Sequence, residues 1–505
     1  MVREVVLCAD LGTGSLRVGA VTAKGQVVAS ATASMRAGAP AGASGAIDPE
    51  TWWRALGRTV GRTLDQLGKR DHVRGISLTG VTRAQVMLGR DGQPLGPALT
   101  FRDGRAGDAA SELARHFPGD NPADAITAFH PLARIAWLAR TRPRTFDRVS
   151  AIVEPKDFLN LRLTGRIAAD SVTYSRYDAL LSAAPALPER LERCVRLLDL
   201  PRIAPWEAVG NVDNGRSPWQ RVAGIPVFAG SMDAWASAVG AGAVCDGQGY
   251  DIAGTSEVAG LVTAARASAP GLVSLRWAEN TWQVGGPTQA GADCAAWCHR
   301  LLRLRGSLAA AVERAGALAP AHVRPVFVPF LAGERAPLWR RDVRGVFEGL
   351  AFDTSGDELL WAVLEGVAMQ MRVILTLAVG RATTRLREVR VAGGGAQSNA
   401  WCAMKADVMN VPMIRTTQLE TGLVGAAMAA AIGLGWHDSL AAAAGAMCKV
   451  ERIFEPRPAR VAIYAERIHR HARARQHAID GADAARDAAA HAQSDKSMSR
   501  VGAAT

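Results

Sequence analysis

The sequence predicts an α/β fold in which two domains face one another across a cleft. Three apolar runs are predicted strands that each end in a small, hydroxyl- or glycine-rich turn: residues 5–9, 250–253 and 389–392. This strand–turn unit occurs in both halves of a 505-residue chain, which is long enough for two domains with ample cores. Such a repeat favours duplicated domains that share a cleft.

The three turns have the chemistry of a phosphate site. They read Asp10-Leu11-Gly12-Thr13-Gly14-Ser15-Leu16-Arg17, Gly254-Thr255-Ser256 and Gly393-Gly394-Gly395-Ala396. Turns of this kind gather backbone amides around a polyanion, most plausibly the phosphates of a nucleotide. The first turn also carries a carboxylate for a metal ion, so the pattern predicts a phosphotransferase.

The remaining elements follow in chain order. Residues 18–21 and 27–30 are predicted to form a hairpin, followed by a helix over 50–69 and a buried strand over 73–79. A short strand at 226–229 leads into a helix over 233–243. We expect a first domain at residues 1–245 and a second at 246–475. The segment 476–505 has no apolar stripe and is expected to be disordered.

Composition excludes some function classes. The formal net charge is +12, but 53 of the 59 basic residues are Arg scattered along the chain, with no dense basic block among aromatics. Nucleic acid is therefore not an expected partner. No apolar leader or strongly apolar run of ~20 residues is apparent, so no membrane segment is expected.

The seven cysteines are odd in number and dispersed, which fits free thiols in a reducing, cytoplasmic compartment. Cys294, Cys298 and His299 lie close together, but a zinc site would need further ligands nearby. Buried helix positions explain the two thiols better.

Two carboxylates stand out as candidate catalytic groups. Asp10 follows a buried strand, where it either forms a turn or organises Mg²⁺; Thr13, Ser15 and Arg17 would then contact phosphate oxygens. Asp233 begins a predicted helix, which makes N-capping an alternative role. A carboxylate at a cleft wall is also suited to accept the proton of an attacking hydroxyl.

These motifs resemble those of the FGGY carbohydrate kinases, over nearly the whole chain to about residue 470. Besides the first turn, the matching segments are 80–83 with 91–105, 154–165, 330–337 with 345–347, and 393–399, which contains the third turn. Each motif alone is weak, whereas their shared order and spacing are specific.

The resemblance implies two actin-like, ribonuclease-H-like domains with ATP and substrate between them. It implies Asp233 as the catalytic base, and Asp10 with Asp233 on the metal side. It places ATP and Mg²⁺ at the turns, where the nucleotide-binding candidates are Gly12, Thr13, Gly14, Ser15, Arg17, Gly254, Thr255, Ser256, Gly393, Gly394, Gly395, Ala396 and Asn399. A homodimer is common among such kinases.

The acceptor side is less specific. Asp103 and Arg105 fall where the family often lines its sugar pocket, although a surface turn is the alternative. Xylulokinases usually carry a Gly-Gln-Met-His element where this chain has Gly80-Val81-Thr82-Arg83, and the Asn-Gln-Arg-Glu run of glycerol kinases is absent. Arg83 and Gln85 are then candidate donors to sugar hydroxyls, and a structural Arg at a strand end is the alternative.

Two further acidic residues are given structural roles. Glu334-Arg335 is interpreted as a buried ion pair that closes a loop rather than as a functional pair. Glu420 is interpreted as a residue that favours a helix N-terminus.

Three functions are compatible with these residues. The first is ATP-dependent phosphorylation of a small ketose or polyol, such as D-xylulose, with glycerol, ribulose, gluconate or fuculose as other acceptors. The second is a non-catalytic sugar or nucleotide sensor on the same scaffold, against which the retention of Asp10 and Asp233 argues. The third is an actin- or chaperone-type ATPase, against which the sugar-site resemblance argues.

Overall fold

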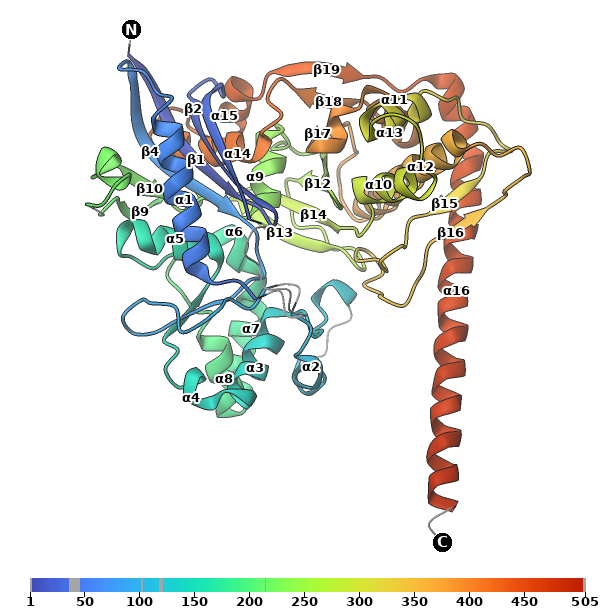
Figure 1. Ribbon diagram of the computed structural model, residues 1–505, viewed down its shortest axis with the longest axis horizontal. Coiled ribbons are helices and arrows are strands. Elements are labelled where there is room, and N and C mark those ends of the chain that lie inside the picture. Colours follow the sequence, from blue (N-terminus) through green and yellow to red (C-terminus); the bar gives the residue numbers. More distant parts are fainter. Residues whose placement is uncertain (1, 36–45, 101–102, 118–120, 214, 503–505) are drawn as a thin grey trace.

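The computed structural model describes residues 2–35, 46–100, 103–117, 121–213 and 215–502, with side chains described as far as residue 488. Two mixed β-sheets form the centres of two domains (Figure 1). The first sheet has the order β3-β2-β1-β4-β10-β9. Its strands are β1 (Arg3–Leu11), β2 (Ser15–Thr22), β3 (Val27–Ser34), β4 (Asp71–Gly80), β9 (Ala208–Asn211) and β10 (Pro226–Phe228).

The second sheet repeats this plan with an extra edge strand. Its order is β13-β14-β12-β11-β17-β18-β19. Antiparallel pairings, two in the first sheet and three in the second, precede two parallel pairings, and an antiparallel strand closes the edge of each sheet. The predicted pair of actin-like, ribonuclease-H-like domains is therefore confirmed. The strands are β11 (Gln248–Ala253), β12 (Glu257–Thr263), β13 (Val273–Ala278), β14 (Thr281–Pro287), β17 (Glu388–Ala392), β18 (Met413–Thr416) and β19 (Val450–Phe454).

Helices cover both faces of the first sheet. Alternate residues of β1 point to opposite sides: Leu7 and Ala9 pack with α1 (Pro49–Leu64), whereas Val6 and Cys8 pack with α9 (Asp233–Gly240) and α14 (Thr421–Gly433). The insertion between β4 and β10 forms a helical layer below the sheet (Figure 1). Its elements are β5 (Val86–Leu88), α2 (Gly107–Ala114), α3 (Pro131–Thr141), α4 (Pro143–Phe146), β6 (Ala151–Val153), α5 (Pro155–Thr164), β7 (Ala169–Asp170), α6 (Ser171–Tyr174), α7 (Asp178–Ala183), α8 (Glu189–Arg196) and β8 (Arg202–Ile203).

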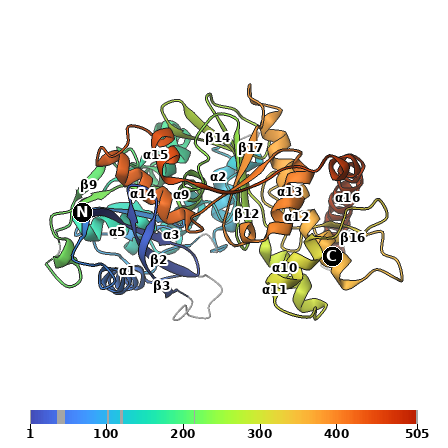
Figure 2. The same ribbon diagram turned by 90° about the horizontal axis from the view of Figure 1, so that it is seen from above.

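The predicted boundary at residue 245 does not separate the two packing units completely. α14 and α15 (Leu440–Met447) belong to the second half of the chain, yet they pack beside β1 and β2 of the first sheet (Figures 1 and 2). α9 and α14 are in backbone contact, because a methyl group added at Gly240 would come within 1.9 Å of the carbonyl oxygen of Thr421. The small residues of both helices permit this approach.

The second sheet is covered by a separate group of helices. They are α10 (Ala292–Leu301), α11 (Leu308–Gly316), α12 (Gly356–Val379) and α13 (Asn399–Met409), joined by the pair β15 (Val326–Val328) and β16 (Val346–Glu348). α12 is long and apolar enough by composition to cross a bilayer, but 72% of its most apolar window is buried inside the protein. It is the central core helix of this domain.

The C-terminal helix α16 (Pro458–Gly502) leaves the body of the molecule (Figure 1). It is anchored by a buried ion pair between Arg467 and Glu365, with N···O distances of 2.5 Å, and by Ala474 against β15. The segment 476–505, which we expected to be disordered, continues this helix as far as Gly502. Its high alanine content explains this difference, because alanine is the strongest helix former even without an apolar stripe.

Candidate active site

Asp10 lies at the end of β1 and faces the N-terminus of α14. A methyl group at Gly422, in the first turn of α14, would come within 2.6 Å of Oδ2 of Asp10. The pKa of Asp10 is raised to about 7, mainly by burial and also by the charge of Asp233, while Arg17 opposes the rise. The residue as a whole is half-buried.

Asp233 is the first residue of α9, and Met232 is the N-cap residue. The Oδ1 atom of Asp233 accepts the backbone N–H of Ala234 at 2.8 Å, so the carboxylate also satisfies one amide of the first turn. Burial raises the pKa of Asp233 to about 6, although the Ala234 amide and the guanidinium of Arg176 lower it. Asp233 therefore fills a helix-end role, and this geometry is compatible with a second role as a base.

The turn before Asp233 is held by close packing against β4 and by a buried hydrogen-bond network. Gly230 has φ +61°, and a methyl group there would come within 1.8 Å of the carbonyl oxygen of Leu78, so the position requires glycine. The Ser231 hydroxyl donates to Oδ1 of Asp170 at 2.7 Å, and Asp170 also pairs with buried Lys156 at 2.8 Å. This buried network sets the direction in which the chain enters α9.

The first phosphate turn connects β1 to β2. The N–H of Gly12 donates to the Ser15 carbonyl at 2.9 Å, which closes the turn, and Thr13 and Gly14 lie at its tip. Arg17, which we expected to clamp phosphate, forms an ion pair with Glu420 at the start of α14. Glu420, expected to favour a helix N-terminus, is the N-cap residue of α14 and also pairs with the candidate clamp.

The second and third turns are neighbours in the second sheet. β11 and β17 are parallel partners, with Ile252 opposite Ala392, so Gly254 and Gly393 begin turns at the same edge. A methyl group on Gly393 would come within 2.6 Å of the Ala253 carbonyl oxygen. The candidate residues gathered here are Gly254, Thr255, Ser256, Gly393, Gly394, Gly395 and Ala396.

Two side-chain networks hold these turns. Lys405 of α13 reaches Asp251 at 2.6 Å and Glu257 at 2.5 Å, so one buried ammonium joins the strands on both sides of the second turn. Arg415 donates to Asn399 at 3.0 Å and to the Ala396 carbonyl at 2.9 Å, which fixes the third turn.

The acceptor-side candidates divide into side chains without a partner among the described residues and side chains that are paired. Arg83 has φ +58° and its backbone N–H donates to Glu154 at 3.2 Å, while its guanidinium has no hydrogen-bond or ion-pair partner among the described residues. Burial lowers the pKa of Arg83 to about 10, and the positive charge of Arg176 adds to this. Gln85 is buried, and neither polar atom of its side-chain amide finds a partner in the described chain.

Asp103 and Arg105 are paired with one another. Arg105 donates to Asp103 through two nitrogens at 2.9 and 2.6 Å, and its guanidinium stacks 4.2 Å from the ring centroid of Trp137. Although burial opposes it, these hydrogen bonds lower the pKa of Asp103. The Asp103 carboxylate is 1% exposed, whereas the Arg105 side chain is 42% exposed, so the pair joins a buried carboxylate to an exposed guanidinium.

The predicted ion pair between Glu334 and Arg335 is wrong. Glu334 accepts two backbone N–H groups at 2.7 Å, from Gln289 and Arg335, and its pKa is raised to about 7 by burial. The Arg335 guanidinium instead donates to Oγ of Ser256 at 2.9 Å and to the Thr288 carbonyl. Both amides bond to Oε1, Oε2 has no hydrogen-bond partner among the described residues, and the guanidinium of Arg335 reaches the second turn instead.

Arg176 and Glu154 were missed by sequence reasoning. Arg176 influences the pKa of both Asp233 and Glu154, and Glu154 also accepts the N–H of Ala84 at 3.1 Å and the Tyr177 hydroxyl at 3.3 Å. The Glu154-Pro155-Lys156 segment was available as a motif, but nothing local revealed its partners.

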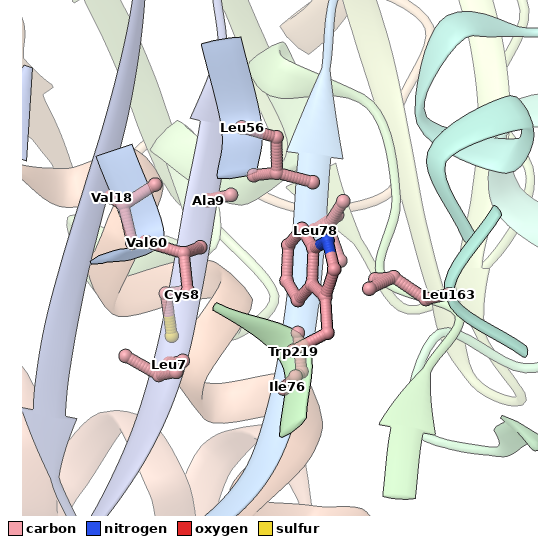
Figure 3. Close-up of a pocket in the computed structure, with 10 residues that line it drawn as sticks. All are labelled: Leu7, Cys8, Ala9, Val18, Leu56, Val60, Ile76, Leu78, Leu163 and Trp219. Carbon is pink, nitrogen blue, oxygen red and sulfur yellow. The ribbon is translucent and has the colours of Figure 1, made fainter. Parts of the chain in front are cut away.

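The apolar cavity in Figure 3 is separate from this site. It measures about 10 Å³ and lies between α1 and the first sheet, closed by Trp219 and Leu163. Every side chain drawn in it is apolar or a thiol, so it offers no group for phosphate or sugar chemistry.

Two family models match the chain. The FGGY family of carbohydrate kinases, N-terminal domain, matches residues 5–240, and the C-terminal domain of the same family matches residues 249–434. Together they cover all three turns and both sheets apart from β19 and the first residues of β1 and β11.

Individual relatives agree with the family match. The xylulose kinase of Streptomyces rubiginosus is 30% identical over 410 residues, covering 79% of this chain and 81% of that protein. The xylulose kinase of Escherichia coli K12 is 29% identical over 462 residues, covering 85% and 90%.

Solved structures share the fold. Xylulose kinase from Rhodospirillum rubrum superposes with a TM-score of 0.80 at 24% identity, covering 95% of this chain and 100% of that one. Gluconate kinase from Lactobacillus acidophilus superposes with a TM-score of 0.82 at 20% identity, covering 94% and 98%.

Proposed function

This chain belongs to the FGGY family of carbohydrate kinases, and we propose that its acceptor is a pentulose such as D-xylulose and its general base Asp233. The supporting observation is the pair of half-buried carboxylates, Asp10 and Asp233, where the first turn meets the N-termini of α14 and α9. Helix N-termini favour anions, so the transferred phosphoryl group has a compatible environment there.

In the proposed reaction Asp233 takes the proton of an acceptor hydroxyl. The hydroxyl oxygen then forms a bond to the γ-phosphorus of ATP, and the bond from that phosphorus to the β–γ bridging oxygen breaks. ADP leaves with the electron pair of the broken bond. A pKa of about 6 suits this role, because the carboxylate is mostly ionised at neutral pH and still holds a proton better than an ordinary Asp.

The residues present fit a Mg²⁺ ion. The charge of Asp233 helps to raise the pKa of Asp10, which means that the two carboxylates repel one another. A divalent cation beside them removes this repulsion. Mg²⁺ commonly takes one or two protein carboxylates and completes its shell with phosphates and water. We propose Asp10 as its principal ligand, with Asp233 beside it; when bound, the ion neutralises charge on the phosphates.

The choice of a pentulose draws on two supports. The relatives reported above are named xylulose kinases, at 29–30% identity. The unsatisfied amide of Gln85 and the free guanidinium of Arg83 offer donors and an acceptor that suit a polyhydroxylated chain. One structural neighbour is named gluconate kinase, so gluconate is the main competing acceptor and is included in the assay below.

A coupled assay of ADP release tests the proposal. Purified protein with ATP and Mg²⁺ is given D-xylulose, D-ribulose, L-fuculose, glycerol or gluconate in separate reactions. Release that depends on D-xylulose is expected, with the phosphorylated sugar identified by mass spectrometry. Dependence on another acceptor corrects the substrate, sugar-independent hydrolysis indicates an ATPase, and no release despite calorimetric binding of sugar indicates a sensor.

A further inference from the structure

Arg83 and Trp339 come from opposite domains and share an unusual backbone conformation. Among the described residues, the non-glycine positions with positive φ are Arg83 (58°), Arg303 (50°), Trp339 (54°) and Asn410 (53°). Arg303 and Asn410 directly follow the ends of α10 and α13, where this conformation is common. Arg83 and Trp339 have no such explanation, and strain of this kind concentrates at functional sites.

The two side chains face one another across the cleft. Cζ of Arg83 lies 6.0 Å from the ring centroid of Trp339, at the outer limit of a direct cation–π contact. In the nearby pair Arg341–Phe129 this distance is 3.5 Å. Both Arg83 and Trp339 are only partly buried. The guanidinium and the indole therefore keep surface that a third group can use.

The first domain also fixes the position of the indole. Nε1 of Trp339 donates to the Gly271 carbonyl at 2.8 Å. The side chain of Asn121, from the first domain, accepts the N–H of Gly271 at 2.8 Å and donates to the Leu272 carbonyl at 3.0 Å. Gly271 has φ +75°, and a methyl group there would come within 2.0 Å of the Pro337 carbonyl oxygen, so only glycine fits.

The pair lies on the side of the proposed base. Arg176 is the charge that most lowers the pKa of Arg83, and it also lowers the pKa of Asp233. Nη2 of Arg176 donates to Sδ of Met232, the residue before Asp233, at 3.7 Å, so Arg176 lies beside the proposed base as well as within coulombic range of Arg83. The acceptor hydroxyl must lie within hydrogen-bond reach of Asp233, which places the rest of the acceptor near Arg83.

We propose that Arg83 and Trp339 form a two-domain clamp on the acceptor. The indole face packs against the C–H groups of a polyhydroxylated carbon chain, and the guanidinium donates hydrogen bonds to its hydroxyl oxygens. This inference rests on the proposed function and adds an acceptor-binding residue, Trp339, from the second domain. Because one half of the clamp lies on each domain, acceptor binding stabilises this arrangement of the two domains.

Steady-state kinetics of Trp339→Leu, Trp339→Phe and Arg83→Gln test the clamp, with D-xylulose as the probe. We expect Trp339→Leu to raise the KM for D-xylulose by about tenfold or more, since removal of an apolar group from a binding site is worth at least that factor. The KM for ATP stays within about twofold of wild type, because the nucleotide turns are untouched. Trp339→Phe, which keeps an aromatic face, falls between Leu and wild type.

Arg341→Ala is the matched control. It removes the other cation–π contact between the same loop and the first domain, the one to Phe129, without touching the clamp. We expect its D-xylulose KM to equal that of wild type. In the double variant of Arg83 and Trp339, the effects should combine to less than the product of the single effects, because each residue acts on the same bound chain.

Some results overturn the clamp without affecting the kinase proposal. If Trp339→Leu and Arg83→Gln phosphorylate D-xylulose with an unchanged KM, or raise only the KM for ATP, the clamp is refuted while the activity stands. If wild type phosphorylates no acceptor, the proposed function fails. The clamp is then tested by calorimetric titration of D-xylulose into wild type and the Trp339 variants. Equal affinity for wild type and Trp339→Leu, or no binding to either, refutes it.

Discussion

The carboxylate of Asp10 and the backbone of Gly422 are in contact, although they lie in distant parts of the chain. The distance of 2.6 Å from an ideal Cβ at Gly422 to Oδ2 of Asp10 is far too short for any side chain. The absence of a side chain at Gly422 therefore lets the N-terminus of α14 approach the end of β1, and this approach positions the candidate metal ligand.

We expect Gly422→Ala to displace Asp10 and lower kcat by tenfold or more, since misplacement of about 1 Å at a site costs up to a hundredfold. Gly445→Ala is the control, because Gly445 lies in the helix α15 with nothing within 4 Å of its ideal Cβ. That change should leave kcat unaltered and stabilise the protein by up to about 1 kcal/mol. Equal activity of the two variants would contradict the role of Gly422.

Asp233→Asn tests the general base. The amide keeps the size of the side chain but accepts no proton, so we expect kcat to fall by ~10²–10⁴. ATP binding, measured by calorimetry, should persist. Asp357→Asn is a suitable control, because Asp357 also lies in the first turn of a helix but pairs with exposed Arg314. Near-wild-type turnover of Asp233→Asn would remove Asp233 as the base.

The pH profile follows from the pKa of Asp233. A base must be unprotonated, so kcat/KM should rise with pH through about 6 and level off above it. Arg176 lowers this pKa, and we expect Arg176→Gln to move the acid limb to higher pH. Arg176→Lys, which keeps the charge, should leave the limb close to wild type. If the acid limb of Arg176→Gln moved to lower pH instead, the assignment of this limb to Asp233 would be contradicted.

Lys405→Met tests the buried network behind the second turn. The change leaves Asp251 and Glu257 buried without their cation, which should cost about 3–5 kcal/mol of unfolding free energy. The loss should be smaller at low pH, because protonated carboxyl groups need no partner; deprotonation makes it larger as pH rises. Lys449→Met, at an exposed position, should change stability by less than about 0.5 kcal/mol. Thermal melts at pH 5 and pH 8 measure both effects.

Local patterns were sufficient where a residue's role depends on its own segment. Asp10 lies at the end of a strand before a tight turn, Asp233 follows a short strand and a tight turn, and the structure places the first at the end of β1 and the second at the start of α9. The paired sheets also follow from the repeat of the strand–turn unit. Local patterns failed for Glu334, whose carboxylate accepts amides from residue 289 as well as from its own turn.

The sequence by itself determined the two-domain α/β fold, the three turns and the carboxylates suited to phosphoryl transfer. Only the tertiary structure decided which charged groups are free and which are already paired. Arg17 is neutralised by Glu420 across 403 residues, whereas Arg83 remains available opposite Trp339. The reason is physical: periodicity and turn chemistry are local, but the partner of a charge is set by long-range packing that no segment encodes alone.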